Sequence, residues 1–266
     1  MAAIVAPFVT VLAAMLAVMM LSWLFQRKLV NAGWTDLFWT LGTGVSLVPV
    51  ALLASPRIGW RSVLVALLVG AWAARLGGHI FLRVLGGAED VRYAKARRDW
   101  GDAFQGRMLA LSLIQAPVTA ILAVSVALAA SAPSASVRVA DLAAVAVFLI
   151  ALGGESLADL QLKRFKAHPE NRGRVCDAGL WGFSRHPNYF FEGLIWLAWP
   201  MMAFSPHAPW TWAAFAAPVT MFALLRFVSG VPPLEAAMLA SKGDAYRRYQ
   251  ARVSAFIPLP PERSHP

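Results

Sequence analysis

Residues 179–192 read GLWGFSRHPNYFFE and lead directly into the apolar run GLIWLAWP at 193–200. Arginine, histidine, asparagine and glutamate therefore stand at the beginning of a segment that is apolar enough to enter a membrane. Ionisable groups at that depth are costly and usually mark a binding or catalytic site. The stretch predicts a membrane protein with a polar site at the end of one of its helices.

The composition of the whole chain agrees with a membrane protein. Of the 266 residues, 59% are hydrophobic and 14% are charged, whereas about a quarter of the residues of a soluble domain are charged. Runs of the roughly 17–25 apolar residues that a bilayer requires recur along the chain. They lie at 4–25, 34–53, 63–85, 108–130, 139–157, 189–204 and 209–228. The sequence predicts an all-α, polytopic fold with about seven transmembrane helices in a single domain, residues 1–266.

The basic residues alternate between the connections. Lysine and arginine are concentrated at 27–28, 92–107, 163–185 and 242–263, whereas the intervening connections hold only Arg57, Arg61 and Arg138. By the positive-inside rule, the N-terminus is outside and the C-terminus is cytoplasmic. Three cytoplasmic segments, 86–107, 161–188 and 229–266, carry nearly all the charge, and we expect them to form one cofactor site.

Several other classes of protein are excluded by the pattern. The single cysteine, Cys176, excludes an intrachain disulfide, and no spacing of His, Cys, Asp and Glu suggests a metal site. The net charge of +10 is explained by topology, because no basic helix or aromatic motif typical of nucleic-acid binding accompanies it. No internal repeat of the kind that builds many transporters is present.

Two carboxylates mark the end of the 139–157 run. Glu155 and Asp159 are four residues apart, so they share a helix face on which Lys163 also lies. They either pair with the basic segment that follows or form a polar wall that binds a ribose or an amide. The preceding pair, Gly153 and Gly154, predicts a close approach by a helix or a ligand.

The 163–192 segment combines cations with aromatic rings. Arg174 and Arg185 flank the turn at 177–179 and Trp181, and arginine is suited to bind phosphate through two parallel hydrogen bonds. His186 is either a catalytic acid or a hydrogen-bonded strut before Pro187. Asn188 and Glu192 share a face at the start of the next helix, where an unpaired carboxylate would be costly unless it faced a ligand.

Further polar residues fall near the same cytoplasmic boundary. Asp36 opens the 34–53 run, His79 lies in the 63–85 run, and Arg226 closes the 209–228 run. Beyond the breaking sequence at 229–233, residues 234–251 have helical spacing, with Glu235 near the start and Tyr246 near the end. This helix is either an interfacial anchor or a wall folded over the site.

The chain resembles the bacterial steroid 5α-reductase family, which consists of integral membrane reductases of the 3-oxo-5α-steroid 4-dehydrogenase type, and more distantly the sterol reductases. The resemblance covers most of the chain. It rests on Arg75-Leu76-Gly77, Gly87-x-Glu89-Asp90-x-Arg92-Tyr93, Trp100-Gly101, Glu155-x-x-x-Asp159-x-Gln161-Leu162-x-x-Phe165-Lys166-x-x-Pro169-x-Asn171, residues 179–192 and Ser229-Gly230-Val231-Pro232. Isoprenylcysteine carboxyl methyltransferases, which use S-adenosylmethionine, are also similar, through Arg185-His186-Pro187-x-Tyr189 and Gly243-x-x-Tyr246-x-x-Tyr249.

The resemblance implies an NADPH-dependent reductase in the bacterial inner membrane. Its cofactor enters from the cytoplasm, and an apolar, steroid-like or lipid enone enters from the bilayer. By position, Asp159, Arg174, Asn188, Glu192 and Arg226 match the family's cofactor contacts. With the residues identified above, the predicted cofactor-binding set is Glu155, Asp159, Lys163, Arg174, Trp181, Arg185, His186, Asn188, Tyr189, Glu192, Arg226, Glu235 and Tyr246. The chain departs from the family where other members have a Gln-Glu pair and a catalytic tyrosine, because it has Asp36 and either Leu76 or His79.

The expected reaction is reduction of the double bond of an enone such as a 3-oxo-Δ4-steroid. Hydride addition moves negative charge onto the carbonyl oxygen, where a hydrogen-bond donor is needed. The leading hypothesis is that Asp36 is a carboxylic acid held neutral by an apolar wall, with Tyr93 and His79 as alternative donors. Two other functions stay open: a lipid methyltransferase that uses S-adenosylmethionine, and a transporter or lipid-binding protein without enzymatic activity.

Overall fold

The computed structural model describes residues 2–55, 57–86, 89–133 and 136–262. Gly87 of the family-like motif and Arg263 of the tail lie outside these residues. Within them the chain is helical, and the extended backbone pairs in one isolated parallel bridge between Ser184 and Ser254. Helical stretches that are long and apolar enough to cross a membrane number six: Ile4–Leu29, Trp34–Leu53, Trp60–Leu85, Val91–Ser131, Val139–Ala167 and Pro209–Lys242. The prediction of an all-α membrane protein is confirmed.

The described residues form two compact units. The first contains Met1–Ala144 and Trp199–Thr220, and the second contains Val145–Ala198 and Met221–Pro266. The sequence predicted one domain, because the apolar runs follow one another without a linker. The division falls inside helices rather than in loops, so sequence composition does not mark it.

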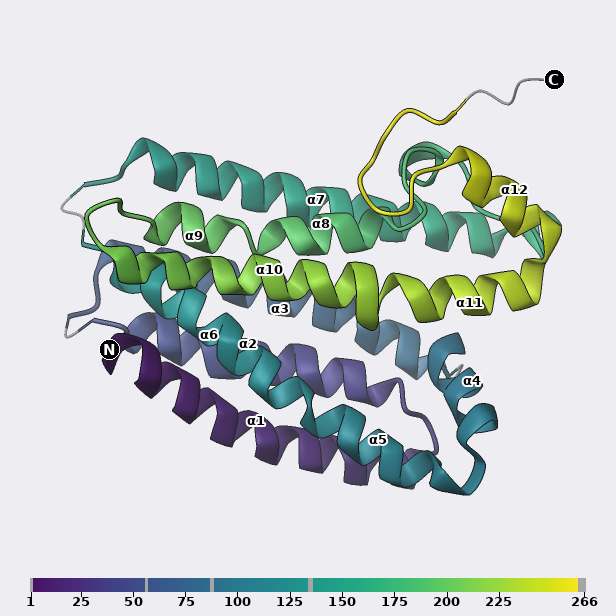
Figure 1. Ribbon diagram of the computed structural model, residues 1–266, viewed down its shortest axis with the longest axis horizontal. Helices are drawn as coiled ribbons and strands as arrows, with labels where there is room; N and C mark the ends of the chain where they lie inside the picture. Colours follow the sequence, from purple (N-terminus) through teal and green to yellow (C-terminus); the bar gives the residue numbers. More distant parts are fainter. Residues whose placement is uncertain (1, 56, 87–88, 134–135, 263–266) are drawn as a thin grey trace. The chain divides into compact units, whose positions relative to one another are not determined.

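The first unit is a bundle of four long helices: α1 (Ala2–Leu29), α2 (Trp34–Leu53), α3 (Trp60–Leu85) and α6 (Gln115–Ser131). Helix α1 packs along α6 and α2, and α2 packs along α3 (Figure 1). Glycine allows the closest contacts, since a Cβ atom on Gly44 would lie 2.4 Å from Cβ of Ala73. Close packing of small residues replaces the hydrophobic effect as the force between helices in lipid.

Shorter elements complete this unit. Helix α4 (Val91–Trp100), the 3₁₀ turn η1 (Gly101–Ala103) and α5 (Phe104–Leu113) connect α3 to α6. The predicted run at 108–130 therefore consists of parts of two helices, α5 and α6, which meet at Ile114. Pro117 explains the break, because its ring clashes with the carbonyl group of Leu113, four residues earlier. Proline also has no N–H to donate to that carbonyl. The unit also includes the first residues of α7 (Val139–Ala167), α9 (Ala198–Ala203) and η4 (Pro209–Phe215).

The predicted span at 189–204 is not one of the six long helices. The chain there forms α8 (Pro187–Ile195) and α9, with Trp196 and Leu197 between them. Pro200 lies in the first turn of α9, where it prevents a continuous helix through residue 196. The other six predicted spans each fall largely within a long helical stretch.

The second unit is built on the rest of α7, on α8 and on the C-terminal helices. It contains η2 (Pro169–Asn171), η3 (Gly179–Gly182), the end of α10 (Ala216–Ala223), a π-helical turn η5 (Leu224–Val228), α11 (Val231–Lys242) and α12 (Asp244–Arg252). A Cβ atom on Gly230 would lie 2.3 Å from the Leu225 carbonyl oxygen, so this tight exit from the π turn requires glycine. The predicted single helix at 234–251 is two helices, because Gly243 has a φ of +54° between them.

Helices α7 and α8 meet at a glycine. A Cβ atom on Gly154 would lie 2.5 Å from the ring of Phe191, whereas one on Gly153 would meet no atom within 4 Å. The close approach predicted at this glycine pair is therefore made at Gly154 alone. It brings the C-terminal half of α7, which carries the polar residues, against the start of α8.

Candidate functional site

The turn that precedes α8 is anchored on α7. The backbone N–H of Leu180 donates to Oε1 of Gln161 at 2.9 Å, and the indole N–H of Trp181 donates to the Ala158 carbonyl at 3.0 Å. Gly179 has a φ of +60°, and a Cβ atom there would lie 2.6 Å from the Gln161 amide. Trp181 is buried, so it is a structural anchor for the turn rather than an open ring for stacking.

Residues 253–259, which we call the C-terminal strap, bind the segment between this turn and α8. The N–H of Arg185 donates to the Ser254 carbonyl at 2.8 Å, and the N–H of Leu259 donates to the Phe183 carbonyl at 3.0 Å. The Ser184 hydroxyl, fully buried, donates to the Phe256 carbonyl at 2.8 Å. The strap therefore holds the segment that positions Arg185 and His186.

Glu235 on α11 is the centre of a polar network. Its Oε1 accepts hydrogen bonds from Nε of Arg185 at 2.6 Å and from the Tyr246 hydroxyl at 3.4 Å. Its Oε2 accepts from the Gln250 amide at 2.9 Å. Arg185 also donates through Nη1 to the Gln250 and Val253 carbonyls, at 3.1 and 2.5 Å. Arg185, Glu235 and Tyr246, all predicted to bind cofactor, are joined to one another and fix α11 and α12 to the start of α8.

Tyr246 and Tyr249 face this network from α12. Both are buried, and burial raises the pKa of each phenol well above its ordinary value. The Tyr249 hydroxyl donates to the Trp181 carbonyl at 2.6 Å. Both rings therefore stay neutral at physiological pH and serve as hydrogen-bond donors within the network.

His186 is the N-cap residue of α8 and is 1% exposed. Its Nε2 lies 3.2 Å from Oε1 of Glu235, and its ring stacks on Tyr189 with 5.7 Å between centroids. Burial lowers its pKa, the Glu235 hydrogen bond opposes that effect, and the charges of Arg185 and Arg226 reinforce it. Nδ1 is buried and has no hydrogen-bond partner within the described ranges. His186 is therefore a hydrogen-bonded strut and a neutral imidazole, and its Nδ1 has no hydrogen-bond partner within the described residues.

The predicted polar wall on α7 is joined to α8. The Asn188 amide donates to Oδ1 of Asp159 at 3.2 Å, and the two residues are half-buried and buried, respectively. Glu155 is buried one turn earlier on α7. Glu192 is buried on α8, where its Oε1 accepts a hydrogen bond from the indole N–H of Trp196 at 3.0 Å. A carboxylate and a carboxamide side by side can bind hydroxyl and amide groups of a ligand.

The remaining predicted cations of this unit are more open. Lys163 and Arg174 are exposed, and Nη1 of Arg174 lies 3.4 Å from the Asn171 side chain. Arg226 is half-buried in the π-helical turn, with its guanidinium 5.1 Å from the Phe227 ring. Short π-helical turns occur frequently at functional sites. Arg174 and Arg226 keep donors that a phosphate group can use.

The predicted catalytic residues lie in the first unit. Asp36, in the first turn of α2, accepts hydrogen bonds from the Tyr93 hydroxyl at 2.6 Å, from Arg92 at 2.8 Å and from Arg83 at 3.1 Å. Asp36 is thus the counter-ion of two guanidinium groups. Within this pair the Tyr93 hydroxyl is the donor and Asp36 is the acceptor. His79 lies on α3, half-buried and one turn before Arg83.

Further ion pairs surround Asp36 and Tyr93. Burial alone would raise the pKa of Asp90, but Arg92 and Arg83 outweigh that effect and lower the pKa to about 2. Glu89 accepts from Arg97 at 2.7 Å and from the Ala32 N–H at 2.8 Å, which ties the α1–α2 connection to α4.

Within each unit the structure joins some of the predicted residues. Arg185, His186, Glu235 and Tyr246 form one network, and Asp159 and Asn188 form a pair in the same unit. Asp36 and Tyr93 form a pair in the other unit. Sequence reasoning missed the contributions of Gln161, Gln250 and the C-terminal strap. The strap offers no signal, since it acts through backbone groups, whereas Gln161 stands within the family-like motif.

The model of a family described as "Protein of unknown function (DUF1295)" matches residues 22–253. The uncharacterized protein C594.04c of Schizosaccharomyces pombe is 35% identical over 97 residues, which cover 36% of this chain and 27% of the yeast protein. This segment spans only about a quarter of the yeast protein's length. No solved structure matches the chain significantly.

Proposed function

The chain belongs to the DUF1295 family, and on this premise we propose that it is an NADPH-dependent membrane reductase acting on the carbon–carbon double bond of an apolar enone. The family includes steroid 5α-reductase-like membrane proteins, in agreement with the motifs of this sequence. A 3-oxo-Δ4-steroid that is reduced to its 5α product is the substrate we infer first, because those motifs resemble the bacterial steroid 5α-reductases.

The observation that carries the proposal is the polar cluster between α7 and α8. The amide nitrogen of Asn188 lies 3.2 Å from Oδ1 of Asp159. His186, two residues before Asn188, is buried, and its Nδ1 has no hydrogen-bond partner within the described residues. Ionisable groups in membrane segments are costly, pair with one another and by default mark a functional site. Because the cluster offers a carboxylate, an amide and an imidazole, it fits the hydroxyl and carboxamide groups of a dinucleotide.

Arginines complete the fit to NADPH. Arg174 and Arg226 can hold phosphate oxygens with paired N–H groups. A 2′-phosphate needs such a cation, which favours NADPH over NADH. The bound cofactor would supply a hydride to the substrate alkene. Arg185 and Glu235 would not contact it, but would hold His186 and the start of α8 in place.

The Asp36–Tyr93 pair is the hydrogen-bond donor that we propose for the substrate carbonyl. In this assignment the Tyr93 O–H, which donates to Asp36 in this structure, turns from Asp36 to the substrate oxygen that gains negative charge, while Arg92 and Arg83 stay paired with Asp36. One such donor contributes about 3–4 kcal/mol to the transition state. A proton then adds at the α-carbon, so the enone takes up one hydride and one proton in total.

We also infer the orientation from the basic residues. The positive-inside rule supports a cytoplasmic C-terminus, an external N-terminus and a cofactor site reached from the cytoplasm of a bacterial inner membrane. This orientation requires that the predicted span at 189–204 also crosses the bilayer beside the six long stretches. Reporter fusions after residues 28, 107 and 133 test this inference. Activity of a cytoplasmic reporter at 133 but not at 28 or 107 would reverse it.

Cofactor binding is the experiment that tests the function. The detergent-purified protein is heated with NADPH, NADH or S-adenosylmethionine, each at saturating concentration. A ligand at a hundred times its dissociation constant stabilises the folded state by about 2.7 kcal/mol. We expect selective stabilisation by NADPH. Stabilisation by S-adenosylmethionine alone would favour methyl transfer, and no stabilisation by any of the three would favour a transporter or lipid-binding protein.

A further inference from the structure

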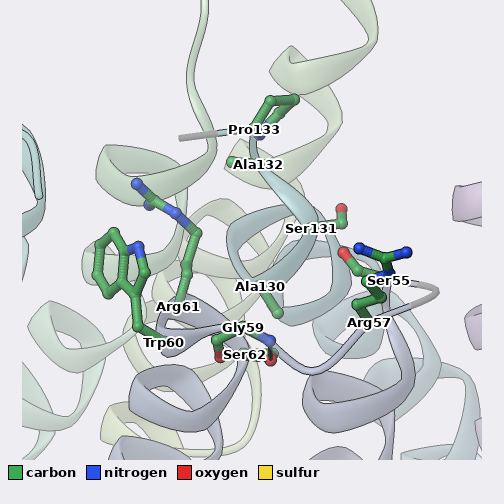
Figure 2. A pocket seen from close by; sticks show the side chains of 10 residues that line it. All are labelled: Ser55, Arg57, Gly59, Trp60, Arg61, Ser62, Ala130, Ser131, Ala132 and Pro133. Carbon is green, nitrogen blue, oxygen red and sulfur yellow. Dashed lines mark hydrogen bonds between the residues drawn. The ribbon is translucent and has the colours of Figure 1, made fainter. Parts of the chain in front are cut away.

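A cavity of about 190 Å³ lies in the first unit, where α2 ends, α3 begins and α6 ends. Its walls include Ser55, Arg57, Trp60, Arg61 and Ser131 (Figure 2). It is smaller than the roughly 300–1,000 Å³ pockets that enclose drug-sized ligands. Its size suits a small polar group rather than a whole lipid or cofactor.

One cation that lines the cavity, Arg57, is not engaged in an ion pair within the described residues. Arg57 is exposed, and within the described part of the chain it has no hydrogen-bond or ion-pair partner. In Figure 2, Arg57 appears with Ser55 and Ser131 on one side, and Trp60 and Arg61 appear on the other. An arginine fork beside hydroxyl groups is the arrangement that binds phosphate oxygens.

A second arginine is built into the wall. Arg61 is 4% exposed and donates to both carboxylate oxygens of Asp141 at 2.6 Å. Its Nε is buried and has no hydrogen-bond partner in the residues that the structure describes. Arg138 also binds Asp141, at 3.1 Å. Arg57, Arg61 and Arg138 against Asp141 leave a local charge of 3 − 1 = +2.

The first turn of α3 adds to this positive potential. Gly59 is the N-cap of a 26-residue helix, and Gly59, Trp60, Arg61 and Ser62 all line the cavity. The backbone N–H groups at a helix N-terminus favour anions.

Exposed apolar side chains lie on α2, on α3 and on the connection between them. Leu53, Ile58 and Leu67 are 76%, 64% and 65% exposed, and Trp60 is 37% exposed. In a membrane protein such residues face acyl chains, and tryptophan belongs at the level of the headgroups. We propose that this cavity binds the phosphate group of an anionic phospholipid, whose acyl chains lie along the exposed faces of α2 and α3. It is separate from the Asp36 cluster, which lies at the other end of α2.

A local reporter tests the proposal. Ile58→Cys is labelled with an environment-sensitive fluorophore, and because Cys176 is buried, label on the unmutated protein measures the background. The detergent-solubilised full chain is titrated with short-chain phosphatidylglycerol, phosphatidylcholine or inorganic phosphate. We expect saturable binding that favours phosphatidylglycerol at least fivefold over phosphatidylcholine, and weaker binding of inorganic phosphate.

Matched variants identify the arginine. Arg57→Gln should weaken phosphatidylglycerol binding at least fivefold. Arg248→Gln removes the same charge from exposed α12 and should change binding by less than twofold. Equal binding by Arg57→Gln and the parent would overturn the proposal. Binding of inorganic phosphate as tight as that of phosphatidylglycerol would overturn the assignment to lipid. Neither outcome depends on the proposed reductase activity.

Discussion

Nε of Arg185 lies 2.6 Å from Oε1 of Glu235, and this ion pair joins the start of α8 to α11 across 50 residues of sequence. Their side chains are only 11% and 17% exposed. The pair therefore has the geometry of a largely buried salt bridge, in which each partner depends on the other because little of either side chain is open to water.

Glu235→Gln should destabilise the protein by about 3 kcal/mol, since it leaves the Arg185 guanidinium buried without its counter-ion. Thermal unfolding in detergent measures the effect. Asp244→Asn is the matched control, because it breaks an ion pair with Arg247 whose side chains are 77% and 72% exposed. If both variants unfolded at the same temperature, the Arg185–Glu235 pair would have no special role.

Gly154→Ala should cost about 1–3 kcal/mol, because its Cβ atom would meet the Phe191 ring at 2.5 Å and force α7 and α8 apart. The neighbouring Gly153→Ala meets no atom and should stabilise the helix by up to about 1 kcal/mol. Opposite shifts in melting temperature are expected. Adding Phe191→Leu should recover part of the loss at Gly154, and its failure to do so would contradict the packing described.

Stability should fall as the pH is lowered from 7.5 to 5.5. Burial holds the pKa of His186 below 6.5 in the folded protein, so the unfolded chain binds more protons in this range. Protonation then favours unfolding. His186→Gln should flatten the dependence of melting temperature on pH, whereas His168→Gln, at an exposed site, should preserve it. An unchanged slope in His186→Gln would assign the effect to other groups.

Tyr93→Phe should lower kcat for enone reduction by about 10²–10³-fold, which is the loss expected for one transition-state donor. NADPH affinity should be unchanged, since the hydroxyl is not assigned to the cofactor. Asp36→Asn should also lower kcat, because it removes the negative charge that accepts from the phenol and from Arg92 and Arg83. Full turnover by Tyr93→Phe would remove Tyr93 from the proposed mechanism.

Arg174→Ala should raise the KM for NADPH far more than that for NADH. The exposed guanidinium is assigned to the 2′-phosphate, which only NADPH carries, and a charge-assisted hydrogen bond of this kind contributes about 1.5–3 kcal/mol. Steady-state kinetics with both cofactors provide the comparison. Arg172→Ala, two residues away and also exposed, is the control, and equal effects of Arg174→Ala on both cofactors would withdraw the assignment.

The sequence predicted the helical membrane fold well, because apolar runs and their basic flanks follow directly from the bilayer as solvent. It failed where proline acts on a preceding turn, as at Pro200, and where glycine has a positive φ, as at Gly243. Hydrophobicity alone does not register either effect.

The sequence identified many residues of the candidate site but not the contacts that they make. Residues close in sequence, such as Glu155 and Asp159, were placed on one face by helical spacing. The contact between Arg185 and Glu235 spans 50 residues, and no local pattern encodes it. The three hydrogen-bond donors to Asp36 come from α3 and α4, and the sequence alone does not place these helices around it.

The hydrogen bond from Ser184 to Phe256 also determines when the site can form during synthesis. Ser184 and Phe256 are 72 residues apart. A ribosome that adds about 5–20 residues per second therefore reaches Phe256 about 4–14 s after Ser184. Through that interval the residues before α8 lack their native backbone partners. The nascent protein inserts its earlier helices first, and only the last stretch of translation supplies the backbone partners of this segment.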